Sequence, residues 1–317
     1  MAFRRTVIAM MVAGATALAG CQANDVLSLK ATAPLPKETL AYMKANGMTA
    51  ASPIFMRIFK DENVLEIWKQ KDTGRYALVK SYEICAYSGV LGPKVREGDR
   101  QAPEGFYFIS KSLLNPNSSF HLSFNTGYPN AFDRSMGRTG SNLMVHGACS
   151  SAGCYSMTDE NIAEIYAFAR EALSGGKQDA FQVQAFPFRM TPENMARHRD
   201  DPNFQFWTML QEGYDHFELT KTPPKVDVCG RRYVFNQVPE QGSFSPSQAC
   251  PPMSMPDNLA LAYRSLQTKQ ALAFDQAVAK LEGHPVPEAQ QSIPLSSIQA
   301  SDDSGTSLTE EEAAPAR

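Results

Sequence analysis

The chain has 317 residues, of which 43% are hydrophobic and 20% are charged, and its formal net charge is −3. Residues 1–20 hold two basic side chains, and residues 286–317 hold six acidic and one basic, so that 27 of each sign remain between them. A neutral body has no electrostatic footprint for nucleic acid, and we expect no such partner. The length suits one large domain or one and a half.

The first residues predict export. Arg4 and Arg5 precede an apolar run, residues 7–18, that is too short to cross a membrane as a helix. Residues 18–21, Leu-Ala-Gly-Cys, resemble a bacterial lipobox, which would make 1–20 a signal peptide and Cys21 the lipidated first residue. An ordinary signal peptide cut near residue 20 is the alternative. Two or three acyl chains anchor a protein stably. Because Gln22 rather than Asp follows, we expect the periplasmic face of the outer membrane rather than the inner.

The next part of the chain shows strand patterns. Residues 21–52 form a lead with a short amphipathic helix at 37–46, which Gly47 ends. The turn residues 72–74, Asp-Thr-Gly, indicate a hairpin. Short strands separated by Gly, Pro and Asn favour a β-sandwich or a barrel-like sheet. The predicted strands are 54–59, 64–68, 76–85, 106–109, 120–124, 143–145 and 181–186.

The periodicity then becomes helical. Thr158 is a good N-cap for a helix that Gly175 ends, and Thr191 with Pro192 starts another. Residues 204–212 and 258–282 predict two more helices. We therefore expect an α+β fold with a sheet-rich domain at 53–190, a helical C-terminal extension at 191–285, and a disordered acidic tail at 286–317.

Five cysteines remain once Cys21 is set aside, and an odd number suggests one free thiol. If Cys154 is free, the other four allow three connectivities. We favour Cys229 with Cys250, which share a Pro-rich stretch, and this leaves Cys85 with Cys149. A bridge between Cys149 and Cys154, acting as a redox switch, is the alternative.

The densest group of reactive side chains runs from His146 to Cys154. The histidine ends a predicted strand, and the cysteine stands just before a predicted helix. The pKa of a thiol falls near a helix N-terminus or beside an imidazole, and backbone N–H groups around Gly153 are placed to stabilise an oxyanion. Spacing alone also allows a structural cysteine or a metal pair, although no second His or Cys cluster completes a metal site.

Several separated motifs resemble one family. His146-Gly147 followed by residues 151–154, Ser-Ala-Gly-Cys, is similar to the catalytic motif of YkuD-type L,D-transpeptidases. Residues 94–99 and 103–107 resemble the segment that leads into that family's sheet. The resemblance covers roughly residues 53–235. The later motifs that look like the YafK-type branch are 186–191, 206–207, 213–214 and 217–218.

The resemblance implies a mixed β-sandwich with the cysteine loop at its mouth, and no metal or organic cofactor. The substrate would be a peptidoglycan stem tetrapeptide, at the bond between meso-diaminopimelate and the terminal D-alanine. By position, Cys154 would be the nucleophile and His146 the general base and acid. Ser151, Gly153 and Gly147 would form the substrate-binding loop.

The sequence departs from the family pattern at two positions. Ala152 replaces a second histidine, and Ser156 replaces an arginine two residues after the cysteine. Another arginine would then have to recognise a substrate carboxylate. Arg189 and Arg138 are candidates, and an ion-paired or solvated surface arginine is the plain alternative for each. The distance in sequence from His146 to Cys154 suits the YafK-type branch.

The resemblance leaves the acceptor open. An amine would give cross-linking or protein attachment, whereas water would make the protein a hydrolase or an amidase that releases a peptidoglycan-linked lipoprotein. A non-catalytic lipoprotein that only binds peptidoglycan is a further alternative. The expected partners are peptidoglycan stem peptides and a peptidoglycan-linked envelope protein, with membrane contact only through the lipid anchor.

Overall fold

The computed structural model describes residues 29–285. The expected signal peptide, the lipidation site at Cys21 and the acidic tail lie outside these residues. Between 29 and 285, no helix has both the length and the apolar character needed to span a membrane.

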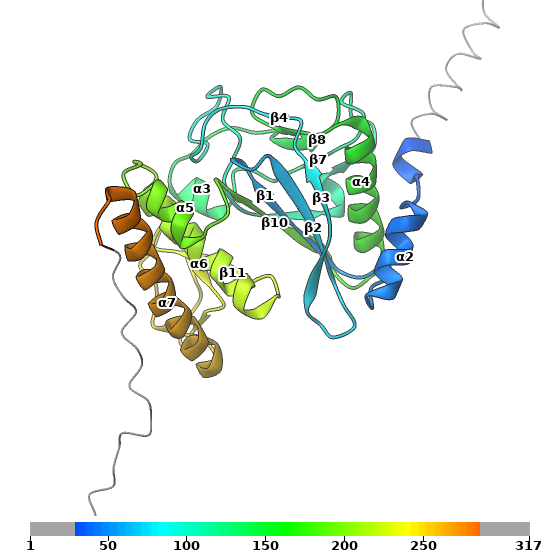
Figure 1. The fold of residues 1–317 in the computed structure, drawn as a ribbon. Coiled ribbons are helices and arrows are strands. Elements are labelled where there is room, and N and C mark those ends of the chain that lie inside the picture. Colours follow the sequence, from blue (N-terminus) through cyan, green and yellow to red (C-terminus); the bar gives the residue numbers. More distant parts are fainter. Residues whose placement is uncertain (1–28, 286–317) are drawn as a thin grey trace, which may run out of the picture.

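A five-stranded mixed sheet forms the centre of the fold (Figure 1). Its strands are β3 (Tyr76–Glu83), β2 (Val64–Gln70), β1 (Ile54–Phe59), β10 (Ala180–Phe186) and β5 (Gly105–Ser110), in that spatial order. The neighbouring strands β1 and β10 run parallel, and the remaining pairs are antiparallel. Every residue of β1 is buried, which is expected of a strand whose two faces are both covered.

A second five-stranded sheet carries the reactive residues. In spatial order its strands are β4 (Ala86–Tyr87), β9 (Tyr155–Ser156), β8 (Met144–His146), β7 (Ser123–Asn125) and β6 (Leu114–Asn115). The prediction of a strand at 120–124 is wrong at its start, because His121 has a left-handed φ of 65° that interrupts extended backbone. β9 is a strand that the pattern did not indicate, and it separates Cys154 from the following helix.

The helices begin where the capping residues predict. The side chain of Thr158 accepts the N–H of Asn161, and that of Thr191 accepts the N–H of Asn194. The helix predicted at 204–212 continues to Thr220. The helices are α2 (Lys37–Ala45), α3 (Ala131–Ser135), α4 (Asp159–Ser174), α5 (Pro192–Arg197), α6 (Phe204–Thr220) and α7 (Asp257–Glu282), with a 3₁₀ turn at Lys111–Leu113.

The central sheet separates two hydrophobic cores. The first joins the two sheets with α4 and α2, and the second lies on the opposite face under α5 and α6. Phe59, Phe106 and Phe186 of the sheet share the second core with Trp207 and Tyr233. Residues on both sides of the boundary expected at 190 therefore pack into one core. The α+β class with C-terminal helices is confirmed. The extension also contains two hairpins, β11 (Val226–Cys229) with β12 (Arg232–Phe235), and β13 (Val238–Pro239) with β14 (Met253–Ser254).

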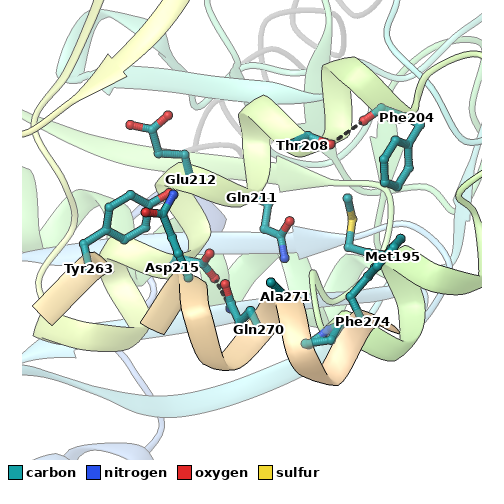
Figure 2. A pocket seen from close by; sticks show the side chains of 12 residues that line it. Met195, Phe204, Thr208, Gln211, Glu212, Asp215, Tyr263, Gln270, Ala271 and Phe274 are labelled. Carbon is teal, nitrogen blue, oxygen red and sulfur yellow. Dashed lines mark hydrogen bonds between the residues drawn. The ribbon is translucent and has the colours of Figure 1, made fainter. Parts of the chain in front are cut away.

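The outermost helix, α7, packs against α5 and α6 without burying any of its own residues completely (Figure 1). A cavity of about 310 Å³ lies beneath it. Figure 2 shows Asp215 and Glu212 of α6 at this cavity, with Gln270 and Tyr263 of α7 opposite. Asp215 is only 2% exposed and accepts a hydrogen bond of 2.8 Å from the Gln270 amide, a neutral donor. The interface between α6 and α7 therefore buries a carboxyl group that forms no ion pair.

Candidate active site

Cys154 lies in the loop that leads into β9, and it is the free cysteine among those that the structure describes. Its Sγ accepts a hydrogen bond of 3.4 Å from the backbone N–H of Met144, at the start of β8. The same sulfur lies 3.9 Å from the carbonyl oxygen of Asn142. The side chain is partly exposed. A reactive thiol is thus held beside β8 and remains open to solvent.

His146 ends β8 and is 3% exposed. In the parallel pairing of β8 with β9, His146 lies opposite Ser156, and Val145 lies opposite Tyr155. Val145 and Tyr155 both enter the first core, which places His146 on the other face. Cys154 lies two residues before Ser156, in the loop that precedes β9, and its Sγ contacts the backbone N–H of Met144 in the strand that His146 ends.

The hydrogen bond of His146 determines its tautomer. Its Nδ1 lies 2.6 Å from the carbonyl oxygen of Gly147. A carbonyl can only accept, so Nδ1 carries the hydrogen and Nε2 keeps a free lone pair. The ring of Phe120 packs against the imidazole with centroids 4.7 Å apart. Burial lowers the pKa of His146, although the Gly147 carbonyl opposes this, and the ring is mainly neutral at pH 7. These features suit a general base.

The ionisation of Cys154 differs from the expectation. Burial raises the pKa of the thiol, while the Met144 N–H and the charge of Lys94 lower it. The predicted help from a helix N-terminus is wrong, because β9 intervenes and α4 begins only at Asp159. The field of a helix falls off within its first turn. The resting thiol is therefore protonated near neutral pH, and a base is needed to activate it.

Ser151 closes a tight turn around the cysteine. Its hydroxyl donates to the carbonyl of Cys154 at 2.7 Å and accepts the N–H groups of Gly153 and Cys154 at 3.3 and 3.1 Å. These are the N–H groups expected to stabilise an oxyanion, and in this conformation Ser151 occupies them. The φ of Gly153 is +126°, which favours glycine at this position. Both residues shape the loop that carries the nucleophile.

A disulfide holds the same loop. Cys85 is bonded to Cys149, and Cys229 to Cys250, so the preferred pairing is confirmed and the alternative bridge from Cys149 to Cys154 is not formed. Cys149 has a left-handed φ of 46°. The disulfide thus anchors a strained backbone segment five positions before the nucleophile.

Gly147 is required by close packing. A Cβ atom there would lie 2.9 Å from the carbonyl oxygen of Phe120 and 2.5 Å from Oδ1 of Asp159. The Asp159 oxygen also accepts the N–H of Ala148 at 2.8 Å, so moving it away would break this hydrogen bond. The structure thus gives Gly147 a packing role next to His146.

Replacing Gly147 with alanine should destabilise the protein by about 1–3 kcal/mol, the usual cost of overpacking. It should also displace the Gly147 carbonyl from the His146 ring and slow alkylation of Cys154. Gly176→Ala, just after the end of α4, is the control. Its φ of +68° makes alanine unfavourable there as well, but the added Cβ would meet no atom within 4 Å, so the variant is destabilised without the packing clash. Urea unfolding and the iodoacetamide rate measure the two effects. Equal alkylation rates in both variants would remove the link between Gly147 and the site.

The candidate arginines are engaged elsewhere. Arg189 forms an ion pair of 2.6 Å with Glu66 of β2, and Arg138 forms one of 2.9 Å with Asp133. Ser156, which replaces the family arginine, is buried and donates to the carbonyl of Ala86 at 2.9 Å. In this structure, none of the three presents a free cation to a substrate carboxylate.

Two neighbours of the site had no role assigned from the sequence. Phe120 covers the His146 ring, and Lys94 acts electrostatically on Cys154. Lys94 belongs to a segment that the sequence singles out only by its resemblance to a family, and it lies 60 residues before Cys154, so the sequence gives no sign that the two interact. Within residues 29–285, no group of three or more His, Cys, Asp or Glu side chains is arranged to hold a metal ion.

Comparison with known proteins adds a family to this geometry. Residues 56–175 match the model of YkuD, the L,D-transpeptidase catalytic domain. Two curated proteins, from Escherichia coli strain K12 and Escherichia coli O157:H7, are each 41% identical to the chain over 231 residues. Each is named "Putative L,D-transpeptidase YafK", and the match covers 73% of this chain and 89% of the relative.

More distant similarity extends to solved structures. The helical cell shape determining protein Pgp2 from Campylobacter jejuni is 18% identical, with a TM-score of 0.34 over 60% of this chain and 79% of that one. Bd1075 from Bdellovibrio bacteriovorus is 16% identical, with a TM-score of 0.33 over 59% and 79%. Neither is similar enough to inform the site.

Proposed function

The chain belongs to the YkuD-type L,D-transpeptidase family, in its YafK-type branch, and from this premise we propose that it is a cysteine acyltransferase acting on peptidoglycan stem peptides. One observation carries the proposal: a free, partly exposed thiol at Cys154 lies beside the strand that ends in His146, whose tautomer the Gly147 carbonyl determines. A nucleophile, a base and a group that orients the base are the parts that thiol catalysis needs.

The first half of the reaction forms a thioester. Nε2 of His146 takes the thiol proton as the sulfur of Cys154 attacks the carbonyl of meso-diaminopimelate in the stem tetrapeptide. The bond to the terminal D-alanine breaks, and the imidazolium returns its proton to the leaving amine. His146 can act as base because its Nε2 carries no hydrogen while Nδ1 donates to the Gly147 carbonyl, and it can act as acid once it has gained the thiol proton.

The second half transfers the acyl group. An amine attacks the thioester, His146 takes the amine proton, and the Cys154 thiolate leaves and recovers that proton. With water in place of the amine, the same steps release a shortened stem peptide or a peptidoglycan-linked protein. For the N–H groups of Gly153 and Cys154 to stabilise either oxyanion, the Ser151 hydroxyl must turn away from them.

The substrate requires the cell envelope. We therefore keep the proposal that residues 1–20 direct export and that a lipid on Cys21 anchors the protein at the periplasmic face of the outer membrane. Peptidoglycan stem peptides, and an envelope protein joined to peptidoglycan, are the proposed partners. Ser151, Gly153 and Gly147 are proposed to shape the binding loop, and Arg189 is left out because Glu66 already pairs with it.

Incubation with purified muropeptides tests the function. Wild-type protein and Cys154→Ala are each mixed with tetrapeptide muropeptides and with lipoprotein-linked ones, and the products are identified by mass. We expect the wild type to release D-alanine and form new cross-links, and the variant to do neither. Shortened peptides without cross-links would make the protein a hydrolase. If the wild type yields no product from either substrate, the proposal fails in favour of a protein that only binds peptidoglycan.

A further inference from the structure

Lys94 is a buried cation in a loop, residues 90–104, that runs past the site. Its side chain is 4% exposed, and its ammonium lies 2.5 Å from Oδ1 of Asp99 and donates to the carbonyl of Arg96 at 3.0 Å. Burial raises the pKa of Asp99, but backbone N–H groups and Lys94 outweigh this and lower it to about 2. Asp99 is therefore ionised near neutral pH.

A buried network of hydrogen bonds and one ion pair holds this loop in place. Glu104 pairs with Lys60 at 3.0 Å, and both side chains are fully buried. Glu104 also accepts the N–H of Gly92 at 2.7 Å. The Tyr128 hydroxyl also donates to the carbonyl of Lys94 at 3.1 Å. The position of Lys94 is thus set before any substrate arrives, as electrostatic preorganisation requires.

The short segment 140–142 joins Lys94 to the nucleophile. A Cβ atom at Gly140 would lie 2.7 Å from Cε of Lys94, so the lysine stem packs directly on this backbone. Two residues later, the carbonyl of Asn142 lies 3.9 Å from Sγ of Cys154. Lys94 and Cys154 therefore lie against neighbouring residues of one short segment, Gly140 and Asn142. The positive charge of Lys94 lowers the pKa of the thiol against the larger effect of burial.

We propose that Lys94 is a positioning residue for catalysis, a preorganised cation that stabilises the Cys154 thiolate, with Asp99 limiting its strength. The inference rests on the proposed function and names a further residue for it. A cation next to a partly buried thiol favours the thiolate, and burial protects their interaction from screening by salt. Lys94 thereby supplies the positive field that the helix N-terminus, displaced by β9, does not provide.

Several other charged or titratable residues lie near the segments that hold the thiol. His146 is the base and is mainly neutral at pH 7, and Oε2 of Glu97 lies 3.3 Å from the Cβ position at Gly140. The backbone of Arg100 approaches Gly153, with its carbonyl carbon 4.0 Å from the Cβ position there. Two further groups on packed elements have other partners: Asp159 accepts the N–H of Ala148 at 2.8 Å, and Arg138 pairs with Asp133 at 2.9 Å.

The pH dependence of Cys154 alkylation tests the proposal without peptidoglycan. Full-length protein is treated with iodoacetamide from pH 6 to 10, and the adduct is followed by intact mass. Lys94→Met should slow alkylation at pH 7 about tenfold, which corresponds to a rise of about one pKa unit. Asp99→Asn should shift the profile the opposite way, because it leaves the ammonium without its counter-charge. Lys94→Arg should keep most of the wild-type rate, and Lys111→Met, an exposed lysine, is the matched control.

Opposite shifts in Lys94→Met and Asp99→Asn support the proposal, because simple damage to the loop would move both variants the same way. Unchanged profiles in folded Lys94→Met and Asp99→Asn overturn it. If Lys94→Met does not fold, Asp99→Asn and Lys94→Arg still decide the question. The two proposals can fail separately. If the alkylation profiles of wild type and Lys94→Met differ as expected but the wild type does not process muropeptides, the proposed function is refuted and the effect of Lys94 on the thiol stands.

Discussion

Replacing Cys154 with alanine will abolish covalent capture of a carbapenem, whereas the wild-type protein will gain the mass of one molecule. The strained lactam amide acylates a thiolate in the way that the stem peptide is proposed to do, and Cys154 is the free cysteine between residues 29 and 285. The other four cysteines described are held in disulfides and cannot form the adduct. Intact mass after incubation measures the result. An adduct that persists in Cys154→Ala would place the nucleophile elsewhere.

His146→Gln separates the base from the nucleophile in the same assay. General-base catalysis contributes about 10²–10⁴-fold, so the acylation rate at pH 7 should fall by that amount. Because burial raises the pKa of the thiol, the deficit should shrink at alkaline pH, where the thiolate forms without a base. A deficit that stays constant up to pH 10 would assign His146 a structural role, consistent with its packing against the ring of Phe120.

Local chemistry in the sequence predicted much of the fold. Thr158 and Thr191 indicated where α4 and α5 begin, because a capping side chain acts within its own turn. The pairing of β1 with β10 could not be predicted in this way. It joins Met56 to Val183, and no turn residue specifies a contact across such a separation. β9 was missed because two residues are too few to show an alternating pattern.

In the site, too, local motifs were visible in the sequence and tertiary contacts were not. His146 and Cys154 share one motif, and the roles proposed for them come from its residue types. The choice of Arg189 rested on charge alone, and the structure pairs it with Glu66 of the central sheet. Lys94 carries the same charge in another motif of the sequence, and only the folded chain packs it against Gly140, two residues from the carbonyl that lies near the thiol. The sequence shows that Arg189 and Lys94 are cations, but their neighbours in the fold depend on tertiary packing.

Replacing Asp215 with asparagine should stabilise the protein in a strongly pH-dependent manner. Burial raises the pKa of Asp215 from 3.8 to about 7, with Glu218 and Glu212 adding to the shift, while Gln270 and Arg57 oppose it. The folded state therefore binds this proton more tightly than the unfolded state does, and the free energy of unfolding falls as pH rises from about 4 to about 7. Above pH 7 the full cost remains, at most about 4 kcal/mol for a shift of this size.

The asparagine removes this cost and keeps the acceptor for the Gln270 amide, which lies at the cavity under α7 (Figure 2). Urea unfolding at pH 8 should show the variant more stable than the wild type by several kcal/mol, and at pH 4.5 the difference should nearly vanish. Asp275→Asn, an exposed acid of α7, is the control and should change neither value by more than about 0.5 kcal/mol. An equal gain at both pH values would show that packing rather than ionisation governs this interface. No gain at either pH would mean that the Asp215 carboxylate of α6 is not destabilised by its burial under α7.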